Sequence, residues 1–96
     1  MIRSFRDKDT ARVFVGRRAK KIPTEIVERA TTKLVVLDQA ETLGELRRPP
    51  SNRLHKLSGE REGQWAIRIN SQWRVCFEFD DEAGDAYAVE ISKHYE

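Results

Sequence analysis

Hydrophobic residues recur at helical spacing in the first half of the chain. After Pro23, apolar positions follow one another at intervals of three and four residues, at Ile26, Ala30, Leu34 and Leu37. Val27 and Val35 would widen this apolar stripe, and proline suits the first turn of a helix. The pattern therefore predicts an amphipathic helix that begins near Pro23 and packs one face on a sheet.

Shorter elements are predicted on either side of this helix. Residues 2–5 are compatible with a short strand, and Asp7 or Asp9 can cap a first helix that ends near Gly16. Residues 42–46 can add another helical turn. The two prolines at positions 49 and 50 end helical potential, and a loop follows them.

From residue 53 onward, the hydrophobic pattern changes to an alternating one, which is typical of strands. One side carries the apolar residues Trp65, Ile67, Ile69, Trp73, Val75, Phe77 and Phe79, interrupted by a polar turn at 70–72. Arg68, Arg74 and Cys76 fall on the other side, away from the predicted core. A last strand is predicted around Val89. Together, these elements predict an α+β fold.

The composition predicts a soluble protein with a single domain over residues 1–96. The sequence is 39% hydrophobic and 35% charged, enough for a small core but without an apolar run that would span a membrane. The N-terminus lacks the apolar segment of a signal peptide, so we expect a cytoplasmic protein. Cys76, the single cysteine, cannot form an internal disulfide, and no local pattern indicates a metal site or a cofactor.

A net charge of +2 conceals four blocks of alternating sign. Residues 1–21 carry +6, residues 22–46 carry −3, residues 47–77 carry +5 and residues 78–96 carry −6. If the fold brings the two basic blocks together, their surface would attract phosphate groups. The alternative is a solvated surface of mixed charge, since charge runs are common on small soluble proteins.

The residues best suited to chemistry lie between positions 52 and 74. His55 stands among basic residues, ahead of the two strands that carry Arg68 and Arg74. Cleaving RNA without a metal needs one group to take the proton of the 2′-hydroxyl, another to protonate the departing 5′-oxygen, and fixed positive charge. Histidine and arginine can fill these roles, although the sequence alone does not assign acid and base.

Each of these candidates also has a structural interpretation. His55 could be a structural residue of a half-buried strand, and Arg61 could form ion pairs with the glutamates on either side of it. Trp65 and Trp73 fit a core role better than base stacking. The glycines at 59 and 63 bracket a turn but lack the spacing of a phosphate-binding P-loop.

These motifs resemble those of the HigB/GraT group of bacterial toxins, within the RelE/ParE superfamily. The likeness spans nearly the whole chain and is carried by residues 1–5, 47–54, 57–65 and 67–77. It implies two N-terminal helices packed on a curved, mostly antiparallel sheet, and cleavage of mRNA on the translating ribosome. It also implies a helix-turn-helix antitoxin of the HigA/GraA type, with operator DNA contacted only through that complex. The exposed faces of the first two helices are reasonable docking surfaces, although the sequence does not locate the contact.

The resemblance further implies roles for individual residues. His55 and Arg74 receive the catalytic assignments, and RNA contacts are expected from Arg53, Lys56, Arg61 and Arg68. The C-terminus departs from the family, which commonly ends in Asp-Tyr-His, whereas this chain reads Lys93-His94-Tyr95. We expect His94 and Tyr95 to supply the missing proton-transfer group, with Lys93 contacting RNA. The alternative is a non-catalytic module that keeps the toxin fold and binds an antitoxin, operator DNA or RNA.

Overall fold

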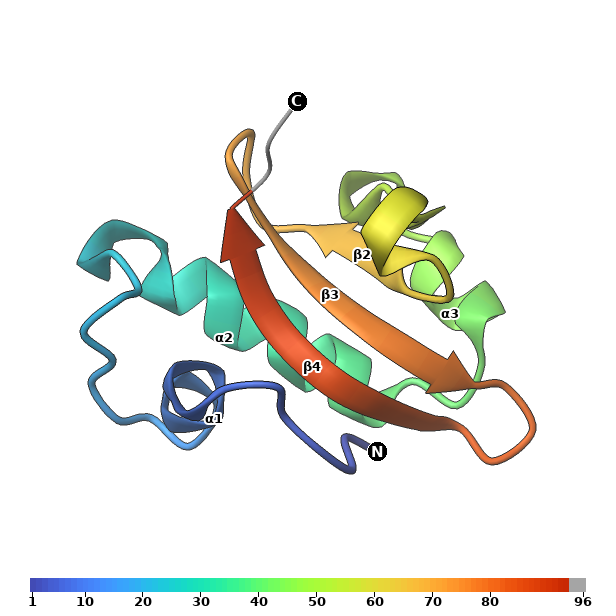
Figure 1. The fold of residues 1–96 in the computed structure, drawn as a ribbon, viewed down its shortest axis with the longest axis horizontal. Helices are drawn as coiled ribbons and strands as arrows, with labels where there is room; N and C mark the ends of the chain where they lie inside the picture. Colours follow the sequence, from blue (N-terminus) through green and yellow to red (C-terminus); the bar gives the residue numbers. More distant parts are fainter. Residues whose placement is uncertain (94–96) are drawn as a thin grey trace.

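The computed structural model describes residues 1–93 and shows helices packed on an antiparallel sheet (Figure 1). The helices are α1 (Lys8–Phe14), α2 (Thr24–Gln39) and α3 (Leu43–Arg47), with short 3-10 turns η1 (Pro50–Asn52) and η2 (Gly59–Arg61). The strands are β1 (His55–Lys56), β2 (Trp65–Arg68), β3 (Trp73–Asp80) and β4 (Asp85–Lys93). The sheet order is β1-β2-β3-β4, and each pair of neighbours is antiparallel. The predicted α+β fold is confirmed.

The apolar face of α2 forms the centre of the core, as the sequence pattern predicts. Its stripe is buried at Ile26, Ala30, Leu34 and Leu37. Val27 packs partly against this core, but Val35 is 40% exposed, so its predicted place on the stripe is wrong. One helical residue turns by about 100°, so Val35 lies beside the stripe while Val36 reaches the core instead. No helix within residues 1–93 has the length and apolar character needed to cross a membrane.

Helix α1 is capped as predicted and is tied directly to the sheet. The Asp7 carboxylate accepts a hydrogen bond from the Thr10 backbone N–H at 2.7 Å, and Gly16 follows the helix with a φ of 81°. The buried Thr10 hydroxyl accepts a bond from the Ile91 N–H of β4 at 2.9 Å. This bond joins α1 to β4, so the helix is fixed against the sheet by a polar contact as well as by packing.

The first residues form less regular structure than the sequence predicts. Instead of a strand over residues 2–5, Ile2 and Phe5 make isolated parallel bridges to Ala86 and Val89 of β4. The Ser4 hydroxyl accepts a hydrogen bond from the Ala88 N–H at 2.8 Å, where the backbone takes a positive φ of 53°. Regular pairing stops where β4 departs from extended geometry, so the two backbone bridges lie on either side of Ala88.

Strands β3 and β4 curve across α2, as Figure 1 shows. Their register shifts between Cys76 and Glu78, which marks a bulge or irregularity in the pairing. Because an extra residue bends the bulged strand and increases its twist, this irregularity explains the curvature. The expected curved, mostly antiparallel sheet is therefore observed.

The second face of the sheet is more covered than the alternation of polar and apolar residues predicts. Ala66 and Cys76, which face each other across β2 and β3, are fully buried on this side. The segment before β2 folds over them, and its Arg61 guanidinium bonds the Glu90 carboxylate of β4 at 3.1 Å and the Ser92 hydroxyl at 3.4 Å. Only tertiary contacts create this cover, so strand periodicity could not reveal it.

Candidate RNA-binding and cleavage site

Two arginines lie side by side at the turn end of the β2–β3 hairpin. Arg68 and Arg74 are direct partners in the strand register, and both are half-buried. The turn between them is held by Asn70, whose side-chain oxygen accepts hydrogen bonds from the Gln72 and Trp73 N–H groups, both at 2.8 Å. This turn brings the two strands into register, so Arg68 and Arg74 are neighbours on the sheet, as predicted.

His55 is oriented by the backbone of the loop that precedes it. Its ring nitrogen Nδ1 lies 2.9 Å from the Arg53 carbonyl oxygen. A carbonyl can only accept, so Nδ1 must carry the proton, and Nε2 of a neutral ring is left as the acceptor. Arg53 adopts left-handed backbone geometry, with φ 47° and ψ 48°, which costs energy for a residue with a side chain. This unusual conformation sets the direction of the carbonyl that orients His55.

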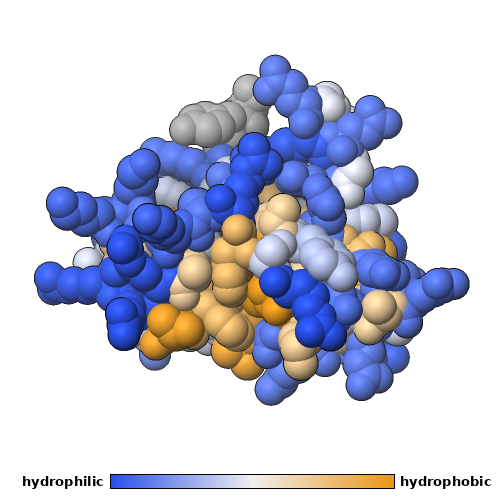
Figure 2. All heavy atoms as spheres, turned by 60° about the horizontal axis from the view of Figure 1, so that its bottom comes forward, coloured by the Kyte–Doolittle hydropathy of each residue, from blue (hydrophilic) through white to orange (hydrophobic). Residues whose placement is uncertain are grey.

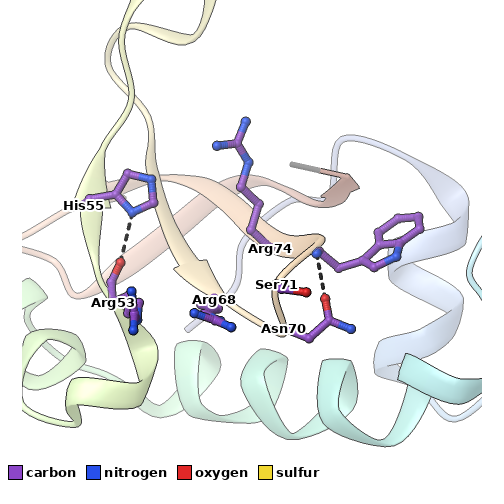
Figure 3. A pocket seen from close by; sticks show the side chains of 7 residues that line it. Arg53, His55, Arg68, Asn70, Ser71 and Arg74 are labelled. Carbon is purple, nitrogen blue, oxygen red and sulfur yellow. Dashed lines mark hydrogen bonds between the residues drawn. The ribbon is translucent and has the colours of Figure 1, made fainter. Parts of the chain in front are cut away.

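These side chains surround a surface hollow of about 230 Å³ (Figure 3). It is lined by Arg53, His55, Arg68, Asn70, Ser71, Trp73 and Arg74. None of these described lining residues is acidic, so the hollow combines three permanent positive charges with a titratable ring. In Figure 3, the Arg74 side chain extends away from α2, whereas Arg53 and Arg68 lie nearer to that helix.

The buried thiol of Cys76, close to Arg74, has the features of an unreactive cysteine. Burial raises the pKa of Cys76 above its ordinary value, and this effect outweighs the nearby Arg74 and Arg61 guanidinium groups, which lower it. Cys76 therefore stays protonated at neutral pH, and it is no candidate nucleophile. Because the folded state holds this proton more tightly, Cys76 contributes stability below the ordinary thiol pKa, and this stability is lost as the pH rises through the raised pKa of the folded state.

We expect the native protein to resist alkylation at Cys76. At pH 7.5, iodoacetamide should leave the folded chain unmodified over a period that suffices for full modification in urea, because the thiol is both buried and protonated. Mass spectrometry of the intact protein measures the modified fraction. Equal alkylation rates with and without urea would contradict this placement of Cys76.

Arg61 lies apart from this hollow, within a network on the covered face of the sheet. Besides its bonds to Glu90 and Ser92, its guanidinium donates to the Gln64 side-chain oxygen at 3.0 Å. Its carboxylate partner is thus Glu90 on β4. The structural alternative, in which Arg61 pairs with the glutamates next to it in the sequence, is wrong. A role in RNA contact stays a prediction for Arg61, and its visible role is to hold the segment that follows His55 against the sheet.

Two further predicted contacts also lie outside the lining of the hollow. Lys56 is exposed and places its ammonium group 5.7 Å from the centre of the Trp65 ring. Lys93 is exposed at the end of β4, opposite Trp73 in the register. Both tryptophans are half-buried and pack against the core, as expected, although Trp73 also lines the hollow. RNA contacts by Lys56 and Lys93 stay predictions.

The predicted catalytic residues His94 and Tyr95 lie outside the described residues. Within residues 1–93, the candidate proton-transfer group in the hollow is therefore His55. No group of three or more His, Cys, Asp or Glu side chains in the same range could hold a metal ion. The described part of the site thus combines three guanidinium groups with one imidazole ring.

One buried residue of the site was missed by sequence reasoning. Asn52 is 1% exposed, and its side-chain amide donates to the Leu46 carbonyl at 3.0 Å. Its side-chain oxygen accepts a hydrogen bond from the Lys33 ammonium group of α2. Asn52 thus links α2, the end of α3 and the loop that carries Arg53. An asparagine after two prolines looks like an ordinary loop residue, so no local signal distinguished it.

Sequence comparisons match this chain to known toxins. Residues 3–94 match the family of HigB-like toxins, described as RelE-like toxins of the type II toxin-antitoxin system HigB. Over 95 residues the chain is 35% identical to "Endoribonuclease HigB" of Proteus vulgaris, covering 99% of this chain and 100% of that protein. It is also 35% identical over 82 residues to "Toxin HigB-1" of Vibrio cholerae, covering 84% of this chain and 86% of that protein.

Solved structures share the fold at lower sequence identity. The YoeB/ParE toxin from Agrobacterium tumefaciens superposes with a TM-score of 0.56 at 15% identity, covering 98% of each chain. A chain from the toxin-antitoxin complex RelBE2 of Mycobacterium tuberculosis gives 0.50 at 19% identity, covering 98% of this chain and 96% of that one. These likenesses show that this chain and the two solved chains share one fold, the arrangement of helices and sheet drawn in Figure 1.

Proposed function

Because this chain belongs to the HigB-like family of RelE-like toxins of type II toxin-antitoxin systems, we propose that it cleaves mRNA on the ribosome without a metal ion. The observation that carries the proposal is the shared hollow, in which His55 and three arginines come together from separate segments. Cleavage here would use only groups of the protein. A toxin with this activity would act in the cytoplasm, where ribosomes translate.

The reaction that suits these groups is an attack within the RNA strand. The 2′-oxygen forms a bond to the adjacent phosphorus, the bond to the 5′-oxygen breaks, and a cyclic phosphate and a 5′-hydroxyl result. Negative charge grows on the phosphate oxygens in the transition state, and fixed guanidinium groups stabilise it there. We assign this role to Arg68 and Arg74, which are partners in the hairpin register and line the hollow.

His55 supplies one of the two proton transfers. Its bond to the Arg53 carbonyl leaves Nε2 able to accept a proton when the ring is neutral, or to donate one when the ring is charged. The second transfer is assigned to the chain end, at His94 or Tyr95. In support, β4 ends at Lys93, opposite Trp73, which itself lines the hollow.

An antitoxin partner follows from membership of a toxin-antitoxin family. The proposed partner is a helix-turn-helix protein that contacts operator DNA in complex with the toxin. Figure 2 shows the side of the molecule that carries α1 and the N-terminus, where apolar side chains gather between hydrophilic flanks. Val15 and Val35, just after α1 and on α2, are among the exposed large apolar residues. Such exposed apolar surface supports docking on the first two helices.

Induced expression should stop growth and cut mRNA within translated regions. Sequencing of RNA ends should find 5′-hydroxyl groups at the cuts, because the proposed attack leaves them there. His55→Ala should suppress the cuts, and the tail variants His94→Ala and Tyr95→Phe identify the second proton-transfer group by the same measurement. Growth arrest without new RNA ends would contradict the proposal and favour the non-catalytic binding module.

A further inference from the structure

A second hollow of about 470 Å³ adjoins the candidate cleavage site on the side of α2. It shares Arg53 and Arg68 with the first hollow, so these two residues line both. Its other polar lining comes from Arg29, Thr32 and Lys33 of α2 and from Ser51 of η1. Figure 3 shows Arg53 and Arg68 close to the helix ribbon, on the side away from the Arg74 guanidinium.

The charges of this second hollow are uncompensated within residues 1–93. Arg29, Lys33, Arg53 and Arg68 form no ion pair with a carboxylate of the described residues, although Arg61 and Arg6 do. The lining residues include no acidic side chain. Four cations gathered without a counter-charge repel one another, so an anion bound among them would gain favourable interactions with all four.

Lys33 is held in this position rather than left to extend into water. Its ammonium group donates to the side-chain oxygen of Asn52, which is itself fixed by its bond to the Leu46 carbonyl. Burial and the neighbouring Arg29 lower the pKa of Lys33, because both destabilise the charged form of its ammonium group. Arg29 stands one turn earlier on α2, so both cations project from one helix face.

We propose that Arg29, Lys33, Arg53 and Arg68 bind phosphates of the substrate RNA strand that flank the scissile phosphate, so that single-stranded RNA runs from the cleavage site along α2. The inference rests on the proposed function, and it adds two residues of α2 to the RNA-binding surface. The hydroxyl of Ser51, which forms no hydrogen bond within residues 1–93, can donate to the same backbone. Contacts of this kind give affinity without base preference.

The test measures binding of a short single-stranded RNA whose 2′-hydroxyls are all methylated, so that it cannot be cleaved. The variants are Arg29→Gln and Lys33→Gln, alone and combined; Arg29 is exposed, so its replacement leaves the core intact. We expect each to weaken binding by about tenfold near 0.1 M salt, and the pair to reduce the slope of log K against log salt by about 1.4. Circular dichroism checks that each variant folds.

A matched control removes two charges elsewhere. The pair Arg17→Gln and Lys20→Gln lies in the connector before α2, where both residues are exposed and line neither hollow. It should leave affinity and salt slope nearly unchanged. If it weakens binding as much as the α2 pair does, RNA binding reflects net charge alone, and the inference is wrong.

Two other results would also overturn the inference. In one, the α2 pair binds the oligonucleotide normally but loses affinity for ribosomes, which would assign the hollow to ribosomal RNA. In the other, only affinity for the purified antitoxin falls. Failure of the proposed function would look different, because the wild-type protein would then bind RNA in this assay yet leave no cuts on translating ribosomes.

Discussion

Arg74→Ala should lower the rate of mRNA cleavage on ribosomes by about 10²- to 10³-fold, equivalent to roughly 2.7–4 kcal/mol of transition-state stabilisation. The reason is that Arg74 holds a fixed guanidinium in the hollow that also contains His55, in a half-buried setting where charge interactions are stronger than in water. Single-turnover cleavage with saturating ribosome complexes measures this rate separately from binding.

The conservative variant Arg74→Lys distinguishes charge from geometry. Lysine keeps the positive charge but loses the planar fork that contacts two phosphate oxygens at once, so we expect an intermediate rate. Urea unfolding of both variants checks that slow cleavage is not caused by loss of folded protein. If folded Arg74→Ala still cleaves at the wild-type rate, the assignment of Arg74 to the reaction is wrong.

Phe77→Ala should remove about 3–5 kcal/mol from the free energy of unfolding. Phe77 is completely buried in the middle of β3, where it faces Trp65 across the sheet and contacts the edge of Phe79 at a ring-centre distance of 6.2 Å. Truncation would leave a cavity that the packed helix and sheet fill only in part. Because small domains are stable by only about 5–15 kcal/mol, this loss would be a large fraction of the total stability.

Urea titration followed by tryptophan fluorescence gives the free energy of unfolding for this comparison. Phe79→Ala is the matched control, because Phe79 is the same residue type, two positions later on the same strand, but only half-buried. Phe79→Ala should lower the free energy of unfolding by clearly less than Phe77→Ala does. A loss below about 1 kcal/mol for Phe77→Ala would contradict its place at the centre of the core.

The structure divides the four arginines between residues 53 and 74 into two groups with different roles. Arg53, Arg68 and Arg74 line the hollow, whereas Arg61 is engaged with Glu90 and Ser92 on the covered face of the sheet. Arg61 thereby secures the segment between His55 and β2, so its replacement would disturb the site through the backbone. Charge alone does not separate these groups, because all four are arginines within the same stretch of 22 residues, from 53 to 74.

The sequence by itself determined most of the elements and the apolar side of strands β2 and β3. Periodicity located α2, β2 and β3, and alternation placed Arg68 and Arg74 as neighbours, because these features depend on residues close together in the chain. Predictions from neighbouring residues were wrong at two places. Val35 lies just beside the apolar stripe, and residues 2–5 form no regular strand because their pairing with β4 is interrupted.

Only the tertiary structure decided which of these residues meet. The left-handed turn at Arg53 aims a carbonyl at His55, buried Asn52 fixes Lys33, and Arg61 crosses to β4. Each contact joins segments whose approach depends on packing elsewhere, so no spacing in the sequence encodes it. Local hydrogen bonding and hydrophobic period are properties of neighbouring residues, whereas a site lined from several segments depends on the completed core that holds them together.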